Sequence, residues 1–284
     1  MTSQSSEQKL ALLREKMQSF GALIIDAKDL DWSPEPSELG KGTNGTVYHT
    51  TWCQKDGVNV HVAAKKTSSV DPNEIKVMMQ LEHQYIIRCY GAVIQEPTFM
   101  IIMEYAPNGS LDKFLKNRSE SPLPLDLVLK WCVNLALAVQ YLHEQDFVHR
   151  DIKASNCLIS ADMELKLCDF HDARELVTTV STEHRGSWPW MAPEVMSERK
   201  FSKKSDVYSL AVVFWQILTC KVPFADAQNG MQIVWRVCEG GERPEIPQGC
   251  PEGLAALLRD CWRQEKNERP DISQVLATLQ LISA

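Results

Sequence analysis

The residues most suited to chemistry lie in one short stretch near the middle of the chain. Positions 149–156 read HRDIKASN, and Asp169 follows Asn156 after thirteen positions. An aspartate such as Asp151 can accept a proton from a hydroxyl nucleophile, and Lys153 can stabilise a phosphate in transfer. Asn156 and Asp169 offer the hard oxygen ligands that magnesium prefers. The stretch therefore predicts phosphoryl transfer, with Asp151 and Lys153 as catalytic residues and Asn156 and Asp169 as metal ligands.

A glycine-rich string and a lysine upstream could bind the phosphates of a nucleotide. Positions 40–47 read GKGTNGTV, and Lys65 follows Val47 after eighteen positions. Glycines let the backbone approach phosphates closely, and their exposed N–H groups can bind the oxygens. The string alone also fits an ordinary turn or a dinucleotide-binding loop, although the strand expected after it argues against the latter. Lys65 ends an apolar run, where its ammonium needs partners such as phosphates and a carboxylate. Without the other motifs, Lys65 also fits an ordinary lysine at the edge of a sheet.

Two regions of different secondary structure must position these residues. From Leu39 to Met103 the sequence predicts short strands, interrupted by one helix from Asn73 to Glu82. After Gly109 the hydrophobic period becomes helical, with Asp126 as the expected cap of the first long helix. Further helices are expected over 206–219, 229–239 and 253–262. This order predicts an α+β fold in two lobes, joined near residues 104–108.

Residues 5–20 predict a short amphipathic helix ahead of the strands. Ser5 with Gln8 fits a capping box, and Gly21 can end the helix. One face carries Leu10, Leu13, Met17 and Phe20. Such stripes usually pack on the body of a domain, which is the favoured interpretation, and a regulatory or partner-binding helix is the alternative.

The composition is that of an ordinary globular protein. The chain has 284 residues, 44% of them hydrophobic and 24% charged, and a formal net charge of −7. The negative charge argues against nucleic acid as the main partner. We expect no membrane span, secretory signal or N-myristoylation, because the sequence lacks the apolar stretch and N-terminal patterns that these require. Nine cysteines without CxxC pairs indicate reduced, packing thiols and a cytoplasmic location.

In their order along the chain, these motifs resemble those of the protein kinase family. The resemblance covers about residues 25–282, nearly the whole sequence. It implies a β-rich N-lobe at about 25–103, a hinge at 104–108 and a mostly helical C-lobe at 109–282, with residues 1–24 as an extension. It also implies that ATP and Mg²⁺ bind and that the γ-phosphoryl group passes to a protein hydroxyl.

The resemblance assigns roles to further residues. Glu74 lies where the family has the carboxylate partner of the lysine, so Lys65 and Glu74 are expected to pair. Asp206 is expected to anchor the catalytic loop, and Arg269 to be the buried partner of Glu194. The ATP-binding positions that the resemblance implies are Gly40, Gly42, Gly45, Val47, Ala63, Lys65, Met103, Glu104, Ala106, Ser110 and Leu158.

At two positions the residue type resembles the pattern of serine/threonine kinases and not that of tyrosine kinases. Lys153 stands two positions after Asp151, and Ser187 lies where serine/threonine kinases bridge that aspartate and lysine. The strings SWPWMAPEV and CWRQEKNERP resemble the tyrosine-kinase-like group, especially its mixed-lineage branch.

The sequence departs from the family pattern at two positions. Asn44 replaces an aromatic residue at the tip of the glycine loop, which predicts weaker shielding of the phosphates. His171 replaces a glycine after Asp169 and Phe170, where a side chain restricts the backbone. The favoured interpretation is a tolerated substitution; the alternative is a pseudokinase that binds ATP or partner proteins with little transfer.

The segment between Asp169 and Glu194 predicts regulation by phosphorylation. Arg150 precedes the catalytic aspartate, as in kinases whose activation segment is ordered by a phosphate, and Arg174 could assist it. The available acceptors for an upstream kinase or for autophosphorylation are Thr178, Thr179, Ser181 and Thr182. An exposed polar loop without this role is the alternative.

Overall fold

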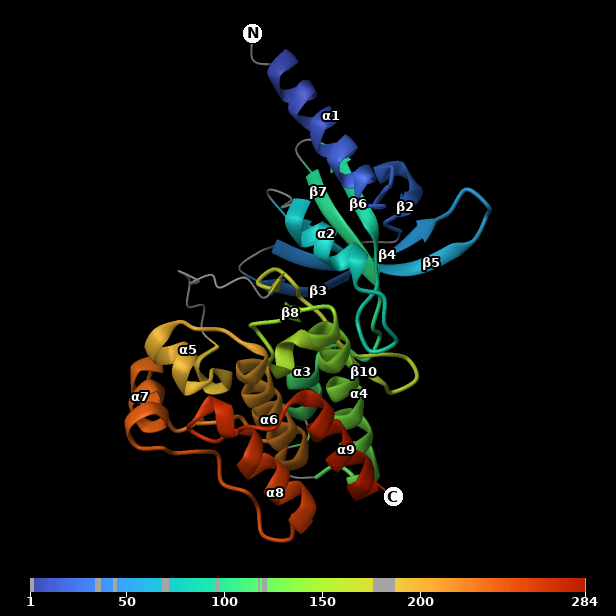
Figure 1. Cartoon of the computed structure of the whole chain (residues 1–284). Helices are drawn as coiled ribbons and strands as arrows, with labels where there is room; N and C mark the ends of the chain where they lie inside the picture. The colour runs from blue at the N-terminus through green and yellow to red at the C-terminus, as the bar shows by residue number, and fades with distance from the viewer. Residues whose placement is uncertain are drawn as a thin grey trace. The chain divides into compact units, whose positions relative to one another are not determined.

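The computed structural model describes residues 3–33, 37–42, 45–67, 72–95, 98–116, 118, 122–175 and 187–283. The chain divides into two compact units, unit 1 from Met1 to Pro107 and unit 2 from Asn108 to Ala284. Unit 1 holds the seven-stranded sheet and unit 2 most of the helices, in the order that the sequence predicts (Figure 1).

Unit 1 is built on one sheet with two helices. Its strand order is β1-β6-β7-β5-β4-β2, and β3 pairs with β4. The strands are β1 (Leu23–Ile24), β2 (Leu30–Asp31), β3 (Ser37–Gly42), β4 (Gly45–Cys53), β5 (Asn59–Thr67), β6 (Cys89–Gln95) and β7 (Thr98–Glu104). The helices are α1 (Ser3–Ser19) and α2 (Pro72–Gln80), with a 3-10 turn at Ala27–Asp29. The described pairs are antiparallel except β1 with β6.

Alternation along the strands explains how the sheet buries a core and still presents polar groups. Val62 and Ala64 of β5 pack in a buried cluster with Val93 and Ile102 of the neighbouring strands. Successive strand residues point to opposite faces. The side chain of Lys65, the next residue of β5, therefore points to the face of the sheet opposite this cluster.

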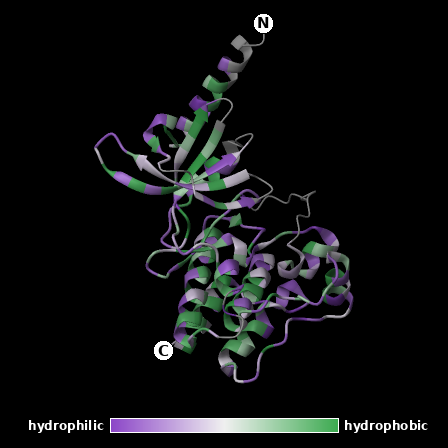
Figure 2. Ribbon diagram, turned by 180° about the vertical axis from the view of Figure 1, so that it is seen from behind, coloured by the Kyte–Doolittle hydropathy of each residue, from purple (hydrophilic) through white to green (hydrophobic). Residues whose placement is uncertain are grey.

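Unit 2 is mostly helical, and hydrophobic residues run along its helices (Figure 2). Its helices are α3 (Leu111–Lys116), α4 (Leu125–Glu144), α5 (Pro193–Glu198), α6 (Lys203–Thr219), α7 (Gly230–Val234), α8 (Glu252–Cys261) and α9 (Ile272–Ser283). The short strands are β8 (Phe147–Val148), β9 (Cys157–Ile159), β10 (Leu165–Leu167) and β11 (Arg174–Glu175). Single turns lie at Ala154–Asn156, Trp188–Trp190, Trp235–Glu239 and Lys266–Glu268.

Helix α4 forms the centre of unit 2. It contacts α6, α9, β8 and β10, and Trp131, Leu135 and Leu142 are fully buried. By length and composition alone, α4 is the one helix in the described ranges that could cross a membrane, although the sequence predicted none. More than half of its most apolar window is buried inside the unit, which is typical of a core helix.

Two predicted helix starts are wrong. Helix α4 begins at Leu125 after Pro124, so Asp126 lies in the first turn and does not cap it. Pro124 is itself the N-cap, and its carbonyl oxygen accepts from the N–H of Val128 at 3.0 Å. Helix α1 begins at Ser3, so Ser5 lies inside it and is not its cap. Its end is as predicted, because Gly21 adopts a φ of +80°, which glycine reaches without strain.

Candidate active site

Asp151 lies at the centre of a polar cluster in unit 2. Its Oδ2 accepts hydrogen bonds from Lys153 Nζ at 2.6 Å and from Asn156 Nδ2 at 2.9 Å. The hydroxyl of Ser187 donates to the other oxygen, Oδ1, at 2.8 Å, and Lys153 Nζ also donates to Ser187 Oγ at 3.0 Å. The bridge expected of Ser187 is therefore present. Three donors fix the Asp151 carboxylate, whose side chain is 18% exposed and so remains accessible to a substrate.

Asp206 fixes the backbone that leads into Asp151. Its Oδ2 accepts from the N–H of His149 at 2.9 Å, and its Oδ1 accepts from the N–H of Arg150 at 3.0 Å. His143 Nε2 lies 3.0 Å from Oδ2. Arg150 adopts a φ of +71°, which is strained for a residue with a side chain. Asp206 is 1% exposed, and its bonds stabilise this strained turn, as expected of the loop anchor.

A hairpin accounts for the thirteen-residue spacing between Asn156 and Asp169. Strand β9 starts directly after Asn156, and β10 returns antiparallel to it, with Leu167 opposite Cys157. The N–H of Cys168 then donates to the Asn156 carbonyl at 2.9 Å. The hairpin thus returns the chain to Asn156 immediately before Asp169.

The side chains around Asn156 and Asp169 are compatible with magnesium. Asn156 Nδ2 donates to both the backbone oxygen and Oδ2 of Asp151, each at 2.9 Å. This arrangement uses the amide nitrogen and leaves the amide oxygen for a cation. No group of three His, Cys, Asp or Glu side chains able to hold a metal occurs among the described residues. One amide and one carboxylate fit magnesium, which keeps several waters and takes its remaining ligands from phosphates.

The substitution at His171 leaves the backbone in a conformation that any residue can adopt. Asp169 has a φ of +64°, whereas His171 is not among the described residues with positive φ. The ring of Phe170 is buried and meets the ring of His149 edge-on, with centroids 5.0 Å apart. His171 therefore does not incur, in this conformation, the backbone strain that replacing a glycine would suggest.

The expected ion pair of unit 1 is present. Lys65 Nζ lies 2.9 Å from Glu74 Oε1, and the two side chains are 14% and 8% exposed. Strand β5 brings Lys65 opposite Val47 of β4 and Ile101 of β7. Because the ammonium is nearly buried, Glu74 supplies one of the partners that it requires.

The glycine string forms the β3–β4 hairpin, so a strand follows it as predicted. Gly40 lies opposite Val47, and Gly42 lies opposite Gly45. Gly45 has a φ of +137°, and a Cβ atom there would lie 2.1 Å from the carbonyl oxygen of Lys66. Glycine at this position is thus required for the close approach of β5, independently of any phosphate.

The end of β7 and the segment after it carry the residues expected near adenine. Met103 lies opposite Ala63 of β5, and Ala106 is buried. The N–H of Glu104 donates to the Arg88 carbonyl at 2.8 Å, and the Glu104 carboxylate accepts from the N–H of Arg88 at 3.2 Å. In unit 2, Ser110 and Leu158 form an isolated antiparallel bridge.

An aromatic contact that the sequence did not predict lies beside this segment. The rings of Tyr105 and His49 are stacked with centroids 4.1 Å apart, and His49 Nε2 lies 3.1 Å from His61 Nδ1. Burial, followed by the neighbouring His61, lowers the pKa of His49. The alternation of β4 and β5 could have shown the two histidines on one face, but no local signal connects them to Tyr105.

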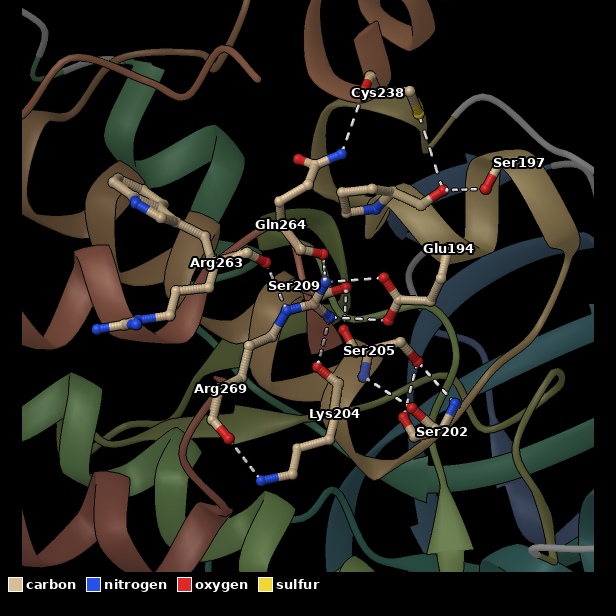
Figure 3. A network of polar contacts seen from close by, with 12 residues as sticks. Glu194, Ser197, Ser202, Lys204, Ser205, Ser209, Cys238, Arg263, Gln264 and Arg269 are labelled. Atoms are coloured by element: carbon tan, nitrogen blue, oxygen red, sulfur yellow. Dashed lines mark hydrogen bonds and ion pairs between the residues drawn. The ribbon is translucent and has the colours of Figure 1, made fainter. Parts of the chain in front are cut away.

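Glu194 and Arg269 form a buried pair with two parallel hydrogen bonds, each 2.8 Å long (Figure 3). The Arg269 guanidinium also donates to the carbonyl oxygens of Arg263, Lys204 and Gln264, at 2.9, 3.1 and 3.2 Å. These contacts satisfy all five of its N–H donors. The Arg269 side chain is fully buried, as predicted, and the pair joins the end of the activation segment to the turn before α9.

The buried cysteines behave as packing residues. All nine are described and all are free thiols. Burial raises the pKa of Cys89 to about 12, and it also raises the pKa values of Cys132, Cys157 and Cys261. Raised pKa values make these thiols poor nucleophiles.

Some predicted positions lie outside the described residues. They are Asn44 at the glycine-loop tip and the acceptors Thr178, Thr179, Ser181 and Thr182.

Comparison with known proteins agrees with this geometry. Residues 35–279 match the family described as protein tyrosine and serine/threonine kinase. The chain belongs to this family. It is 33% identical over 257 residues to mitogen-activated protein kinase kinase kinase 12 of rat, covering 90% of this chain and 27% of that protein. It is 32% identical over 209 residues to the serine/threonine/tyrosine-protein kinase HT1 of Arabidopsis thaliana, covering 73% of this chain and 53% of that protein.

A third relative points the same way. Human mitogen-activated protein kinase kinase kinase 11 is 33% identical over 269 residues, covering 87% of this chain and 31% of that protein. These relatives support a serine/threonine kinase of the tyrosine-kinase-like group, similar to its mixed-lineage branch. The chain spans about a quarter to a half of the length of these three relatives.

Proposed function

We propose that this kinase domain is catalytically active and transfers the γ-phosphoryl group of ATP to a serine or threonine hydroxyl of a protein. The observation that carries the proposal is the complete network of Asp151, Lys153, Asn156 and Ser187. A pseudokinase is the alternative, favoured by His171 in place of glycine. The backbone at His171, which is not strained, argues against it.

Each residue of the network has a distinct role in this reaction. Asp151 orients the substrate hydroxyl and accepts its proton as the new bond to phosphorus forms. Lys153 places a positive charge where the phosphoryl group passes, which lowers the barrier electrostatically. Ser187, which bonds to both, positions them and supports specificity for serine and threonine.

Nucleotide-binding roles are proposed for residues of each unit in turn. Lys65, paired with Glu74, would bind the α- and β-phosphates, and the backbone of residues 40–47 would cover them. Met103, Glu104 and Ala106 would lie beside adenine. Asn156 and Asp169 would hold magnesium, which supplies charge neutralisation on the phosphates when it is bound.

The first test is metal-dependent phosphate transfer. Purified protein with Mg-ATP is expected to phosphorylate itself or a generic basic protein on serine or threonine, and Asp169→Ala is expected to abolish this transfer. Asp162→Ala, at an exposed aspartate in the β9–β10 turn, serves as the matched control and should retain full activity. Radioactive phosphate incorporation and analysis of the phosphorylated residues provide the measurements.

The same experiment distinguishes an active kinase from a pseudokinase. Nucleotide binding raises the melting temperature of a protein by mass action, whether or not transfer follows. Equal background transfer by wild type and Asp169→Ala, with a nucleotide-dependent rise in melting temperature, would establish the pseudokinase and overturn the proposal. Phosphotyrosine as the only product would overturn the assignment to serine and threonine.

Regulation by phosphorylation of the activation segment forms part of the proposal. Burial lowers the pKa of Arg150, and the positive charge of Arg174 lowers it further. A phosphate near them would relieve their repulsion through charge-assisted hydrogen bonds. The acceptors are Thr178, Thr179, Ser181 and Thr182, phosphorylated by an upstream kinase or by the domain itself.

Changing these four residues to alanine together is expected to lower kcat at least tenfold. The reason is that Arg150 and Arg174 would lack the anion that orders the segment. Phosphatase treatment of the wild type should give a similar loss, measured by initial rates on a protein substrate. Full activity of the fourfold variant would contradict this regulation.

The free thiols and the signalling kinases among the relatives support a cytoplasmic signalling role.

A further inference from the structure

The C-terminal part of helix α1 is fixed to unit 1. Met17 is fully buried, and Arg14 Nη2 donates to the carbonyl oxygen of Ile94 in β6 at 2.6 Å. Further toward the N-terminus, Leu12 is 67% exposed, and the helix extends beyond the sheet (Figure 1). The anchored part of α1 is therefore its C-terminal half.

The chain after α1 is fixed to the same strand. The N–H of Ala22 donates to the Met17 carbonyl at 3.1 Å, and β1 then pairs in parallel with β6, with Leu23 opposite Gly91. A Cβ atom at Gly91 would lie 2.1 Å from the carbonyl oxygen of Leu23. Only glycine at position 91 allows this approach, so the sequence of β6 accommodates the extension.

Helix α2, which carries Glu74, depends on packing for its position. It has nine residues, fewer than the roughly 12 that an isolated helix needs to be stable in water. Four of its side chains are buried, those of Glu74, Ile75, Val77 and Met78. Successive residues of a helix are about 100° apart around its axis, so these four side chains span an arc of roughly 160°. This arc is wider than the apolar stripe that a helix needs to face one surface.

Two surfaces account for this wide burial. Helix α2 contacts β6 of the sheet, and it also contacts α1. Next to this contact, Lys76 Nζ of α2 lies 5.9 Å from the centre of the ring of Phe20, the residue directly after α1, within the range of a cation–π interaction. Because α1 is itself anchored to β6, it can support α2 from the second side.

We propose that α1 is a positioning element of the kinase, which holds α2 so that Glu74 pairs with Lys65. The inference rests on the proposed function, since the Lys65–Glu74 pair matters for catalysis only if phosphates bind there. Met17 and Arg14 are the positioning residues. They act through α2 and contact no substrate.

The test is hydrogen exchange of the full chain, followed by mass spectrometry of peptides from α2 and α4. Met17→Ala is expected to increase the exchange rate of the α2 amides at least tenfold and to leave α4 unchanged, because the buried contact of α1 is lost. Leu12→Ala, at an exposed position of the same helix, is the matched control and should change neither helix. Arg14→Ala removes one hydrogen bond and should give a smaller effect in the same direction, which keeps the test informative if Met17→Ala does not fold.

Steady-state kinetics give the second readout. Weakened pairing of Lys65 should raise KM for ATP several-fold in Met17→Ala, with a smaller change in KM for the protein substrate. Unchanged exchange of α2 in a folded Met17→Ala or Arg14→Ala protein would overturn the inference, and so would equal acceleration in α2 and α4.

Hydrogen exchange requires no catalysis. If the wild type does not transfer phosphate, the proposed function fails, and the exchange of α2 still decides whether α1 positions it.

Discussion

Replacing Asp151 with alanine is expected to lower kcat by about 10²–10⁴, the usual contribution of a positioned general base. The Asp151 carboxylate accepts from Lys153, Asn156 and Ser187 at 2.6–2.9 Å, so its orientation is fixed before the substrate binds. Alanine removes the proton acceptor and leaves the Lys153 ammonium without its anionic partner. Initial rates at saturating ATP and protein substrate measure the effect.

A second measurement separates loss of chemistry from loss of binding. In Asp151→Ala the rise in melting temperature on adding Mg-ATP should remain close to that of the wild type, because Lys65, Asn156 and Asp169 are unchanged. Asp162→Ala controls for the removal of an aspartate from the same unit. A loss of kcat smaller than tenfold would contradict the role of Asp151, and loss of the nucleotide-dependent stabilisation would indicate a binding role instead.

The proposed catalytic residues could be singled out from the sequence because they are close together in it. Asp151, Lys153 and Asn156 lie within six positions, and a hairpin returns the chain to Asn156 just before Asp169. The partners of more distant residues, such as Arg269 with Glu194, came from resemblance to the kinase family. Nothing local in either sequence segment identifies the other.

Contacts that depend on tertiary packing could not be predicted. The stack of Tyr105 on His49 joins residues 56 positions apart. The stripe on α1 predicted packing, and Met17 is buried, but the sequence did not indicate that α2 lies next to α1. Asp126 has the side chain of a typical helix cap, but the helix starts one residue before it, with Pro124 as the N-cap.

Replacing Arg269 with methionine is expected to cost about 3–5 kcal/mol of unfolding free energy, as is usual when one partner of a buried ion pair is removed. Methionine keeps much of the volume, so the cost comes mainly from the Glu194 carboxylate, which loses both of its 2.8 Å bonds. For a unit of this size, the melting temperature should fall by roughly 6–20 °C. Thermal unfolding followed by tryptophan fluorescence measures it.

An exposed ion pair of the same chemistry provides the matched control. Arg259 lies 3.0 Å from Glu252, and the two side chains are 56% and 83% exposed. Arg259→Met should therefore change stability by no more than about 1 kcal/mol. Changing Arg269 to methionine and Glu194 to leucine together should cost less than Arg269→Met alone, because no buried charge is then left without a partner. Equal stability losses for Arg269→Met and Arg259→Met would contradict the role of the buried pair in holding the end of the activation segment to the turn before α9.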